Sequence, residues 1–246
     1  MSKEQTLIYG IRSVKEAIES EKSLNRVYLQ RGLKGASAFD LIKTLNKKQI
    51  EISYVPIEKL NRFTLKNHQG VVATIAPIKF LSIDELSKIV EKKKDSCQIL
   101  ILDQISDVRN FGAIVRTAEC SGVDCIIIQS SGNAPVNGDT IKTSSGAVFN
   151  VPICKVGHIK DGIFLLKQLN IKIYGATEKA KKNIYQTDFK SSQAIVMGSE
   201  GKGLSKSVID LCDELIKIPL LGKIESLNVS VACGTILYEI VRQKGY

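Results

Sequence analysis

Two glycine-bearing segments near the end of the chain carry polar side chains that could do chemistry. The first, Val196 to Ser205, reads Val-Met-Gly-Ser-Glu-Gly-Lys-Gly-Leu-Ser, and the second, Ile218 to Ala232, contains Ser226 and Asn228. Each begins at the end of an apolar stretch that is typical of a buried strand. Ligands of parallel α/β sheets bind just beyond such strand ends. The two segments therefore predict a small-molecule site.

The first segment differs from the two common phosphate-binding loops. Gly198 and Gly203 have the spacing of a P-loop, but Leu204 stands where that motif requires its lysine. A dinucleotide-binding turn beginning at Gly201 has Lys206 in place of its last glycine. Both nucleotide-binding interpretations are therefore disfavoured.

A third segment, residues 102–118, places an arginine among apolar residues. If a helix begins near Asn110, this residue is a plausible cap and Arg116 projects from the second turn. A guanidinium in an apolar setting normally needs an anionic partner. A local carboxylate such as Glu119 or Asp103 would satisfy it, and so would an anionic ligand, and these residues alone leave both possibilities open.

Length and composition limit the class of protein. The chain has 246 residues, 43% hydrophobic and 24% charged, which suits one large or two modest domains with a buried core. It has neither a run of about 18 apolar residues nor an apolar leader, so we expect a soluble, cytoplasmic protein that does not enter a membrane.

The six cysteines form no Cys-x-x-Cys pair and lie far from both histidines. We interpret them as reduced core residues and expect no metal site.

Positive charge is concentrated in the first third of the chain. Residues 1–80 contain 14 Lys and Arg against 7 Asp and Glu, whereas residues 81–246 contain 21 against 18. Such a distribution suits a module that binds a polyanion. An ordinary lysine-rich surface would have the same composition, so charge alone does not decide between them.

The apolar pattern divides the chain near residue 77. Residues 1–76 predict a compact α/β unit, with helices and strands over 11–19, 26–30, 36–46, 51–55 and 70–76. Residues 77–96 predict a linker with a connecting helix, in which Ser82 and Glu85 form a capping box. Residues 97–246 alternate apolar strands with helices, the last over about 227–242, and predict a mostly parallel sheet covered on both faces.

Together, the three segments resemble the SpoU (TrmH/RlmB-like) family of SPOUT RNA ribose 2′-O-methyltransferases. Residues 110–116, 197–201 and 218–230 are similar to the family's first, second and third motifs, in the family's order and spacing. Residues 97–246 would be the catalytic domain. The front unit is similar to the ribosomal-protein-like RNA-binding domain of RlmB-type members, on the evidence of residues 9–11 and 68–71. We interpret His68 as capping a loop rather than contacting RNA.

The resemblance implies an α/β catalytic domain whose parallel sheet contains a deep trefoil knot, an exception to the general avoidance of knots. It also implies S-adenosylmethionine as the cofactor, with no metal. By position, it places Thr177, Gly198, Ile218 and Leu227 around the cofactor.

The resemblance further implies a catalytic set of Arg116, Asn110, Glu200, Ser226 and Asn228. A ribose hydroxyl is a weak nucleophile, so an enzyme must align it with the methyl donor and assist loss of its proton. An arginine is a costly base, and we expect Arg116 to bind the adjacent phosphate and stabilise the developing alkoxide. Ser226 and Asn228 would position the ribose or Arg116, and Glu200 would organise its loop or handle the proton. Without the motifs, Ser226 and Asn228 could be helix caps and Glu200 a solvated turn residue.

The extra front domain implies RNA of the large ribosomal subunit as the partner, with a guanosine of 23S rRNA as the expected target. A tRNA ribose methyltransferase would share the catalytic domain. A non-catalytic RNA-binding or ribosome-assembly factor would share the basic front domain, but it would not need the catalytic set beside a cofactor loop. Family members are homodimers packed through the knot region, and the apolar last helix suits such an interface, although burial within one chain is the alternative.

Overall fold

The computed structural model describes residues 7–19, 24–75, 78–93 and 96–245. The chain divides into two compact units: an N-terminal unit, Met1–Lys79 with Pro135–Asp139, and a C-terminal unit, Phe80–Ala134 with Thr140–Tyr246. The division at Lys79 lies three residues beyond the end that we predicted for the front domain, residue 76.

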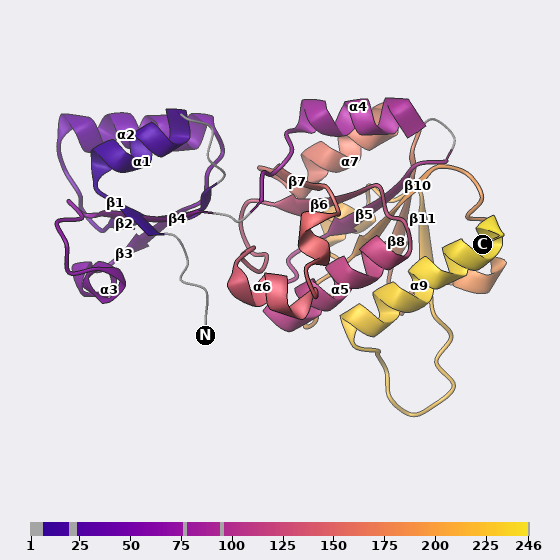
Figure 1. Cartoon of the computed structure of the whole chain (residues 1–246). Coiled ribbons are helices and arrows are strands. Elements are labelled where there is room, and N and C mark those ends of the chain that lie inside the picture. The colour runs from indigo at the N-terminus through magenta and orange to yellow at the C-terminus, as the bar shows by residue number, and fades with distance from the viewer. Residues whose placement is uncertain (1–6, 20–23, 76–77, 94–95, 246) are drawn as a thin grey trace. The chain divides into compact units, whose positions relative to one another are not determined.

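The N-terminal unit is a four-stranded sheet of order β1-β4-β2-β3 with helices on both faces (Figure 1). Val27 and Leu29 of β2 face the larger core under α1 and α2, whereas Tyr28 faces a smaller core beside α3. The predicted helices and strands are confirmed, but the sequence did not reveal β1 or α3. Both are too short for their periodicity to be recognised. The elements are β1 (Leu7–Tyr9), α1 (Ile11–Glu19), β2 (Leu24–Gln30), α2 (Ala36–Lys47), β3 (Ile52–Val55), α3 (Ile57–Phe63) and β4 (Val71–Ile75).

The C-terminal unit contains a seven-stranded parallel sheet of order β7-β6-β5-β10-β8-β11-β9. Central strands are buried on both faces, which explains their continuous apolar sequences. This confirms the predicted mostly parallel sheet. The strands are β5 (Gln98–Leu102), β6 (Cys125–Gln129), β7 (Ile153–Val156), β8 (Lys172–Ala176), β9 (Lys182–Asn183), β10 (Gln193–Met197) and β11 (Glu214–Lys217).

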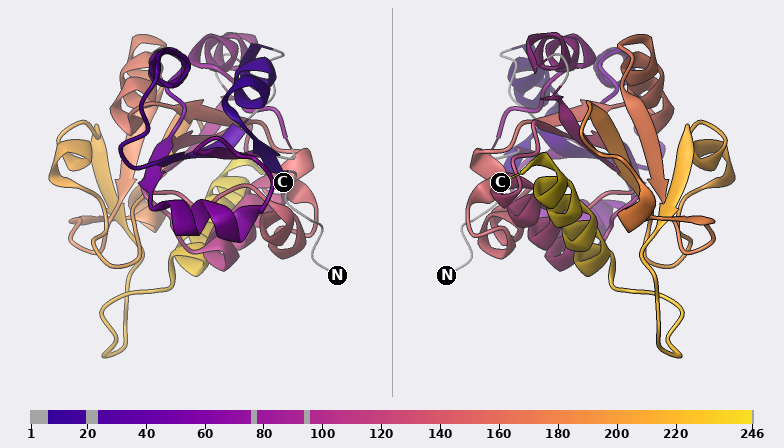
Figure 2. Two further views of the ribbon diagram at one scale, coloured as in Figure 1. Left: turned by 90° about the vertical axis from the view of Figure 1, so that its left-hand side faces the viewer. Right: turned by 90° about the vertical axis from the view of Figure 1, so that its right-hand side faces the viewer.

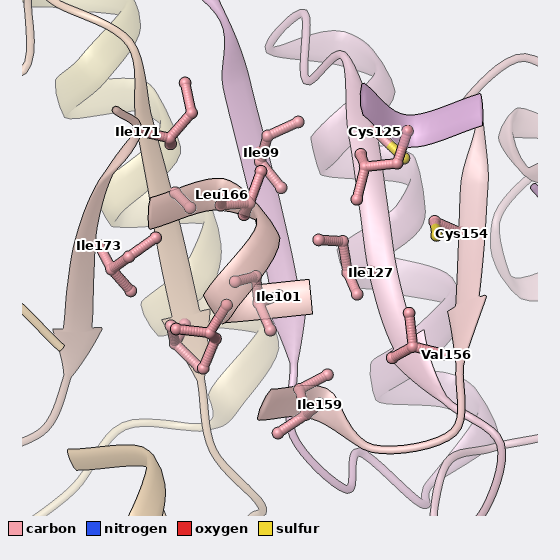
Figure 3. Close-up of a cluster of buried hydrophobic side chains, with 14 of the residues drawn as sticks. Ile99, Ile101, Cys125, Ile127, Cys154, Val156, Ile159, Leu166, Ile171 and Ile173 are labelled. Atoms are coloured by element: carbon pink, nitrogen blue, oxygen red, sulfur yellow. The ribbon is translucent and has the colours of Figure 1, made fainter. Parts of the chain in front are cut away.

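Helices cover both faces of this sheet (Figure 1). α4 (Ile83–Lys93) and α7 (Ile159–Gln168) lie on one face, and α5 (Val108–Cys120) and α9 (Val229–Lys244) lie side by side on the other. Figure 3 shows the core between α7 and the sheet, where Ile99, Ile101 and Ile127 are fully buried. Two short helices are α6 (Gly138–Thr143), whose last four residues belong to this unit, and α8 (Lys206–Ile209).

The helix predicted as a connector belongs to the C-terminal unit. The capping box is confirmed, because Ser82 N donates to Glu85 Oε2 at 2.8 Å and Glu85 N donates to Ser82 Oγ at 3.2 Å. Leu86 and Val90 of α4 are buried in the core with the sheet. The predicted connecting helix is therefore confirmed as α4, and its apolar face packs on the sheet of the C-terminal unit. Residues 77, 94 and 95 of the predicted linker lie outside the described residues.

Most of the cysteines are core residues, as predicted. Cys97, Cys125, Cys154 and Cys233 are buried, but Cys120 at the end of α5 is exposed. Burial raises the pKa of Cys97 and of Cys154 to about 12, so both remain thiols at neutral pH. No cluster of three or more potential metal ligands occurs among the described residues. Within the same residues, no helix is both long and apolar enough to cross a membrane.

Candidate active site

The carboxyl ends of β8, β10 and β11 meet at one edge of the C-terminal sheet. β10 lies between β5 and β8 although it follows both in the chain, so this is a topological switch point, where α/β sheets bind ligands. Thr177, Gly198 and Ile218 each stand just after one of these strands. Thr177 N donates to Ile216 O at 2.9 Å, which links the ends of β8 and β11. The structure thus brings three of the four predicted cofactor residues to one edge.

The fourth, Leu227, lies on the long loop between β11 and α9. Figures 1 and 2 show this loop reaching away from the sheet in every view. Its apolar side chains are exposed: Leu221 is 99% exposed, Ile224 77% and Leu227 41%. Leu227 therefore offers an apolar surface beside the first turn of α9 rather than a wall of a closed cavity.

A tight loop follows β10 and presents Glu200. Ser199 N donates to Gly203 O at 3.2 Å, and Gly203 N donates to Ser199 O at 2.8 Å, so the loop closes on itself. A Cβ on Gly198 would lie 2.2 Å from the carbonyl carbon of Gly203 and 2.4 Å from Leu204 N. The chain's own backbone therefore excludes a side chain at Gly198.

Three polar side chains, one from each motif, form a hydrogen-bonded set that we call the polar triad: Asn110, Glu200 and Asn228. Asn110 Nδ2 donates to Glu200 Oε1 at 2.5 Å, and Asn228 Nδ2 donates to Asn110 Oδ1 at 3.1 Å. The partners are 90 and 118 positions apart in the chain. The structure therefore unites the three motifs at the loop that follows β10.

Asn110 is free to join the triad because it is not the helix cap. α5 begins earlier than predicted, at Val108, and Asp107 caps it. Asp107 Oδ1 accepts hydrogen bonds from the backbone N of Arg109 and of Asn110, both at 2.8 Å. The prediction that Asn110 caps the helix was wrong, and its side chain points instead to Glu200.

Asn228 has two roles at the start of α9. It is the cap of this helix, and its Oδ1 accepts hydrogen bonds from Ser230 N at 2.9 Å and from Ser230 Oγ at 2.6 Å. Its Nδ2 remains available for Asn110. The structural and the functional interpretations of Asn228 are therefore compatible, since each uses a different atom of the amide.

Arg116 lies outside the triad. It is exposed, and no hydrogen bond or ion pair joins it to another described residue. The buried stripe of α5 consists of Phe111, Ile114, Val115 and Ala118, which turns Arg116 away from the sheet. The expected apolar setting was wrong, and the local ion pair with Glu119 or Asp103 does not occur. Ser226 is likewise exposed on the long loop.

Asp103, which the sequence suggested only as a possible partner of Arg116, is a buried carboxylate immediately after β5. Asp103 is only 3% exposed, and burial is the main cause that raises its pKa. Its backbone N donates to Met197 O at 2.9 Å, and its carboxylate accepts hydrogen bonds from the backbone of Ser205 and the side chain of Gln104. Asp103 thus connects the end of β5 to Met197, which precedes the Glu200 loop, and to Ser205, which follows it. The sequence offered one signal for this residue, namely its position directly after an apolar stretch typical of a buried strand.

We expect substitutions of Asn228 to separate its two roles. Asn228→Asp keeps an oxygen to cap α9 but loses the donor to Asn110, so stability should change little while the activity supported by the triad falls at least about tenfold. Asn228→Ala removes both and should also lower the free energy of unfolding by about 1 kcal/mol. Urea unfolding and methyl-transfer assays would measure the two effects. Full activity of Asn228→Asp would show that the bond to Asn110 is dispensable.

Comparisons with known proteins show to which family the chain belongs. The SpoU rRNA Methylase family matches residues 98–238, and a family described as RNA 2′-O ribose methyltransferase substrate binding matches residues 7–81. A Bacillus subtilis protein, YacO, assigned to the TrmH family of tRNA/rRNA methyltransferases, is 33% identical over 244 residues, covering 99% of this chain and 98% of its own. A Staphylococcus epidermidis protein with the same family assignment is 35% identical over 241 residues, covering 98% and 97%.

Solved structures show the same fold. The SpoU methyltransferase AviRb from Streptomyces viridochromogenes, solved with AdoMet, has a TM-score of 0.62 at 23% identity and covers 97% of this chain and 90% of its own. The A. aeolicus TrmH/SpoU tRNA modifying enzyme has a TM-score of 0.56 at 30% identity and covers 66% and 82%. Both family matches and the full-length relatives lead to one conclusion: the chain belongs to the SpoU, or TrmH, family of RNA methyltransferases.

Proposed function

We propose that the protein transfers a methyl group from S-adenosylmethionine to a ribose 2′-hydroxyl, and that this ribose belongs to a guanosine of 23S rRNA. The observation that carries the proposal is the polar triad at the switch point of the sheet, where a carboxylate and two amides from three separate motifs meet. A non-catalytic RNA-binding factor would have no use for this arrangement.

The residues at this edge fit the cofactor. Thr177, Gly198 and Ile218 supply backbone groups at adjacent strand ends, and Leu227 supplies an exposed apolar side chain for an aromatic ring. The bound cofactor would supply an electrophilic methyl group on a sulfonium. AviRb, a neighbour with the same fold, was solved with AdoMet.

The polar residues would act on the ribose and its proton. The Glu200 carboxylate is exposed and accepts one amide hydrogen from Asn110, so it can accept the proton that leaves the 2′-hydroxyl when this oxygen takes the methyl group from the sulfonium sulfur. Asn110 holds that carboxylate in place, and Asn228 in turn holds Asn110. Arg116, exposed and without a partner among the described residues, would bind the neighbouring phosphate and stabilise negative charge on the oxygen. Ser226 on the long loop would position the ribose.

The front domain favours ribosomal RNA over transfer RNA as the substrate. The match over residues 7–81 shows a separate substrate-binding domain. The A. aeolicus tRNA modifying enzyme, in contrast, covers 66% of this chain. An extra RNA-binding domain suits a large RNA in which the target is one site among many, and the YacO relative is assigned to tRNA/rRNA methylation without a choice between them.

Transfer of a radiolabelled methyl group tests the proposal. Unmodified 23S rRNA and unmodified tRNA would be incubated separately with labelled S-adenosylmethionine, followed by digestion to nucleosides. Label in 2′-O-methylguanosine from rRNA alone is the expected result. Label only in tRNA would keep the reaction and overturn the substrate, and no transfer to either RNA, with the cofactor still bound, would overturn both choices of substrate.

We also propose that two copies of the chain associate through α9 and its preceding loop. Val231 and Tyr238 are two turns apart on one side of α9 and are 54% and 53% exposed, and the loop before the helix exposes Leu221 and Ile224. Such apolar exposure suits a symmetric contact. Tyr238→Glu should convert a dimer to a monomer in sedimentation velocity, whereas a wild-type protein that sediments as a monomer at micromolar concentration would contradict the proposal.

A further inference from the structure

Three segments at one end of the N-terminal sheet carry a cluster of positive charge. The first is Gly10 with the first turn of α1, residues 10–13, and the other two are the loops 31–35 after β2 and 64–70 before β4. Together they contain Arg12, Arg31, Lys34 and Lys66 but no Asp or Glu, and all four side chains are exposed. We call these three segments the basic end of the unit.

The four cations have no carboxylate partner among the described residues. Arg31 Nε donates to a backbone carbonyl, that of Tyr54, at 3.4 Å, and Lys66 Nζ lies 5.8 Å from the centre of the Tyr9 ring. Two other cations of the same unit do have a carboxylate partner. Arg26 lies 3.2 Å from Glu51 at mid-sheet, and Lys15 of α1 pairs with Asp40 of α2.

The segments that carry these cations are fixed to one another by hydrogen bonds. Gly10 N donates to Val71 O at 3.0 Å, and Ile11 N donates to Gln69 Oε1 at 3.1 Å, which joins the first segment to the third and to the start of β4. Gln30, the last residue of β2 before the second segment, donates from its N to Gly70 O of the third at 2.9 Å. The charges are thus held on a connected backbone.

Buried groups behind the loops hold this backbone further. His68 is 8% exposed; its Nδ1 accepts a hydrogen bond from Gly70 N at 3.0 Å, and its Nε2 lies 2.9 Å from Asn61 Oδ1. These contacts confirm the interpretation of His68 as a structural residue. Gly70 packs so tightly that a Cβ would lie 2.7 Å from Leu33 Cδ1. A surface built this way loses little conformational freedom when a ligand binds.

We infer that the basic end contacts the phosphates of the RNA substrate, with Arg12, Arg31, Lys34 and Lys66 as the contacting side chains. The inference rests on the proposed function and names the surface that recognises the RNA. Exposed cations without carboxylate partners in the described part of the chain can offer their charge to phosphate oxygens, and contacts to phosphates release counterions and so supply affinity. Because these contacts do not read bases, the basic end would position the RNA and leave the choice of nucleotide to the catalytic unit.

The test compares two double variants of the full-length chain that remove the same charge. Arg31→Ala/Lys34→Ala alters the basic end, and Lys43→Ala/Lys47→Ala, on exposed positions of α2, is the matched control. Binding of an unmodified 23S rRNA transcript would be measured by filter retention from about 50 to 200 mM salt. The first variant should reduce the slope of log affinity against log salt by about 1.5 and raise the Kd at least about tenfold. The control should change the Kd less than about twofold.

Two further measurements make the outcome decisive. Affinity for S-adenosylmethionine without RNA should be unchanged in both variants. In methyl-transfer assays, Arg31→Ala/Lys34→Ala should raise the KM for RNA and leave kcat unchanged. Arg12→Ala/Lys66→Ala, in the other two segments of the basic end, repeats the test if the first variant melts at a lower temperature than the control. Equal salt slopes for basic-end and control variants would overturn the inference. If the basic-end variant shows the expected loss of salt dependence but the wild-type protein methylates neither 23S rRNA nor tRNA, the proposed function fails and the inference about the RNA-binding surface stands.

Discussion

Arg116→Ala is expected to lower the rate of methyl transfer by about 10²–10³-fold while the stability of the protein and its affinity for S-adenosylmethionine remain unchanged. The structure sharpens this expectation, because Arg116 is exposed and has no partner among the described residues. Removing its guanidinium leaves no buried group unsatisfied. A loss of activity would therefore report on contact with substrate and not on folding.

Arg109→Ala provides the matched control for Arg116→Ala. Arg109 is exposed on the same helix, α5, so its removal changes the charge of the helix by the same amount. Single-turnover methyl transfer with saturating cofactor would compare the two variants, and thermal melting would confirm that both are folded. If Arg116→Ala retained the rate of Arg109→Ala, Arg116 would have no part in catalysis.

Gly198→Ala is expected to weaken both the fold and cofactor binding. The new Cβ would lie 2.2 Å from the carbonyl carbon of Gly203, a backbone atom that cannot move without opening the loop. Overpacking of this kind costs about 1–3 kcal/mol, which for a protein of this size lowers the melting temperature by about 3–10 °C. Affinity for the cofactor should also fall, because this loop follows β10 at the switch point, where we expect the cofactor to bind. Melting curves and calorimetric titration would measure both effects.

Gly201→Ala tests the reason for that effect. Gly201 lies in the same loop, but a Cβ there would have no heavy atom within 4 Å, so the variant should melt and bind as wild type does. The cofactor-free melting temperature of Gly198→Ala decides between the two explanations for the glycine. An unchanged value with weakened cofactor binding would favour a clash with the ligand over the loop-closing contact seen in the structure.

Much of the fold could be predicted because buried parallel strands and amphipathic helices leave periodic signals. Ile99 to Leu102 and Ala194 to Met197 are apolar at every position, and both are fully covered strands. The order of the strands could not be predicted, since nothing in the sequence of β10 indicates that it lies between β5 and β8. The trefoil knot implied by the resemblance remains a prediction.

The site was predictable in its members but not in its contacts. Glu200 and Asn228 were named from motif positions, and the structure joins both to Asn110. Asn110 was expected to cap a helix because the true cap, Asp107, lies only three residues earlier and has the same preference. The environment of Arg116 was misjudged because neighbours in sequence are not neighbours on a helix. Each residue turns the helix by about 100°, so Ile114 and Ala118 form a buried stripe from which Arg116 points away.

The position of β10 also determines when the site can form as the protein folds. β5 pairs with β10 across about 95 positions of chain, and the triad requires residues up to Asn228. Contacts this distant in sequence form slowly, because the chain loses the entropy of a long loop before any contact compensates for it. A partly synthesised or partly folded chain therefore contains the motifs without the site. Methyl transfer becomes possible only when the whole C-terminal unit has assembled, which keeps incomplete molecules inactive toward RNA.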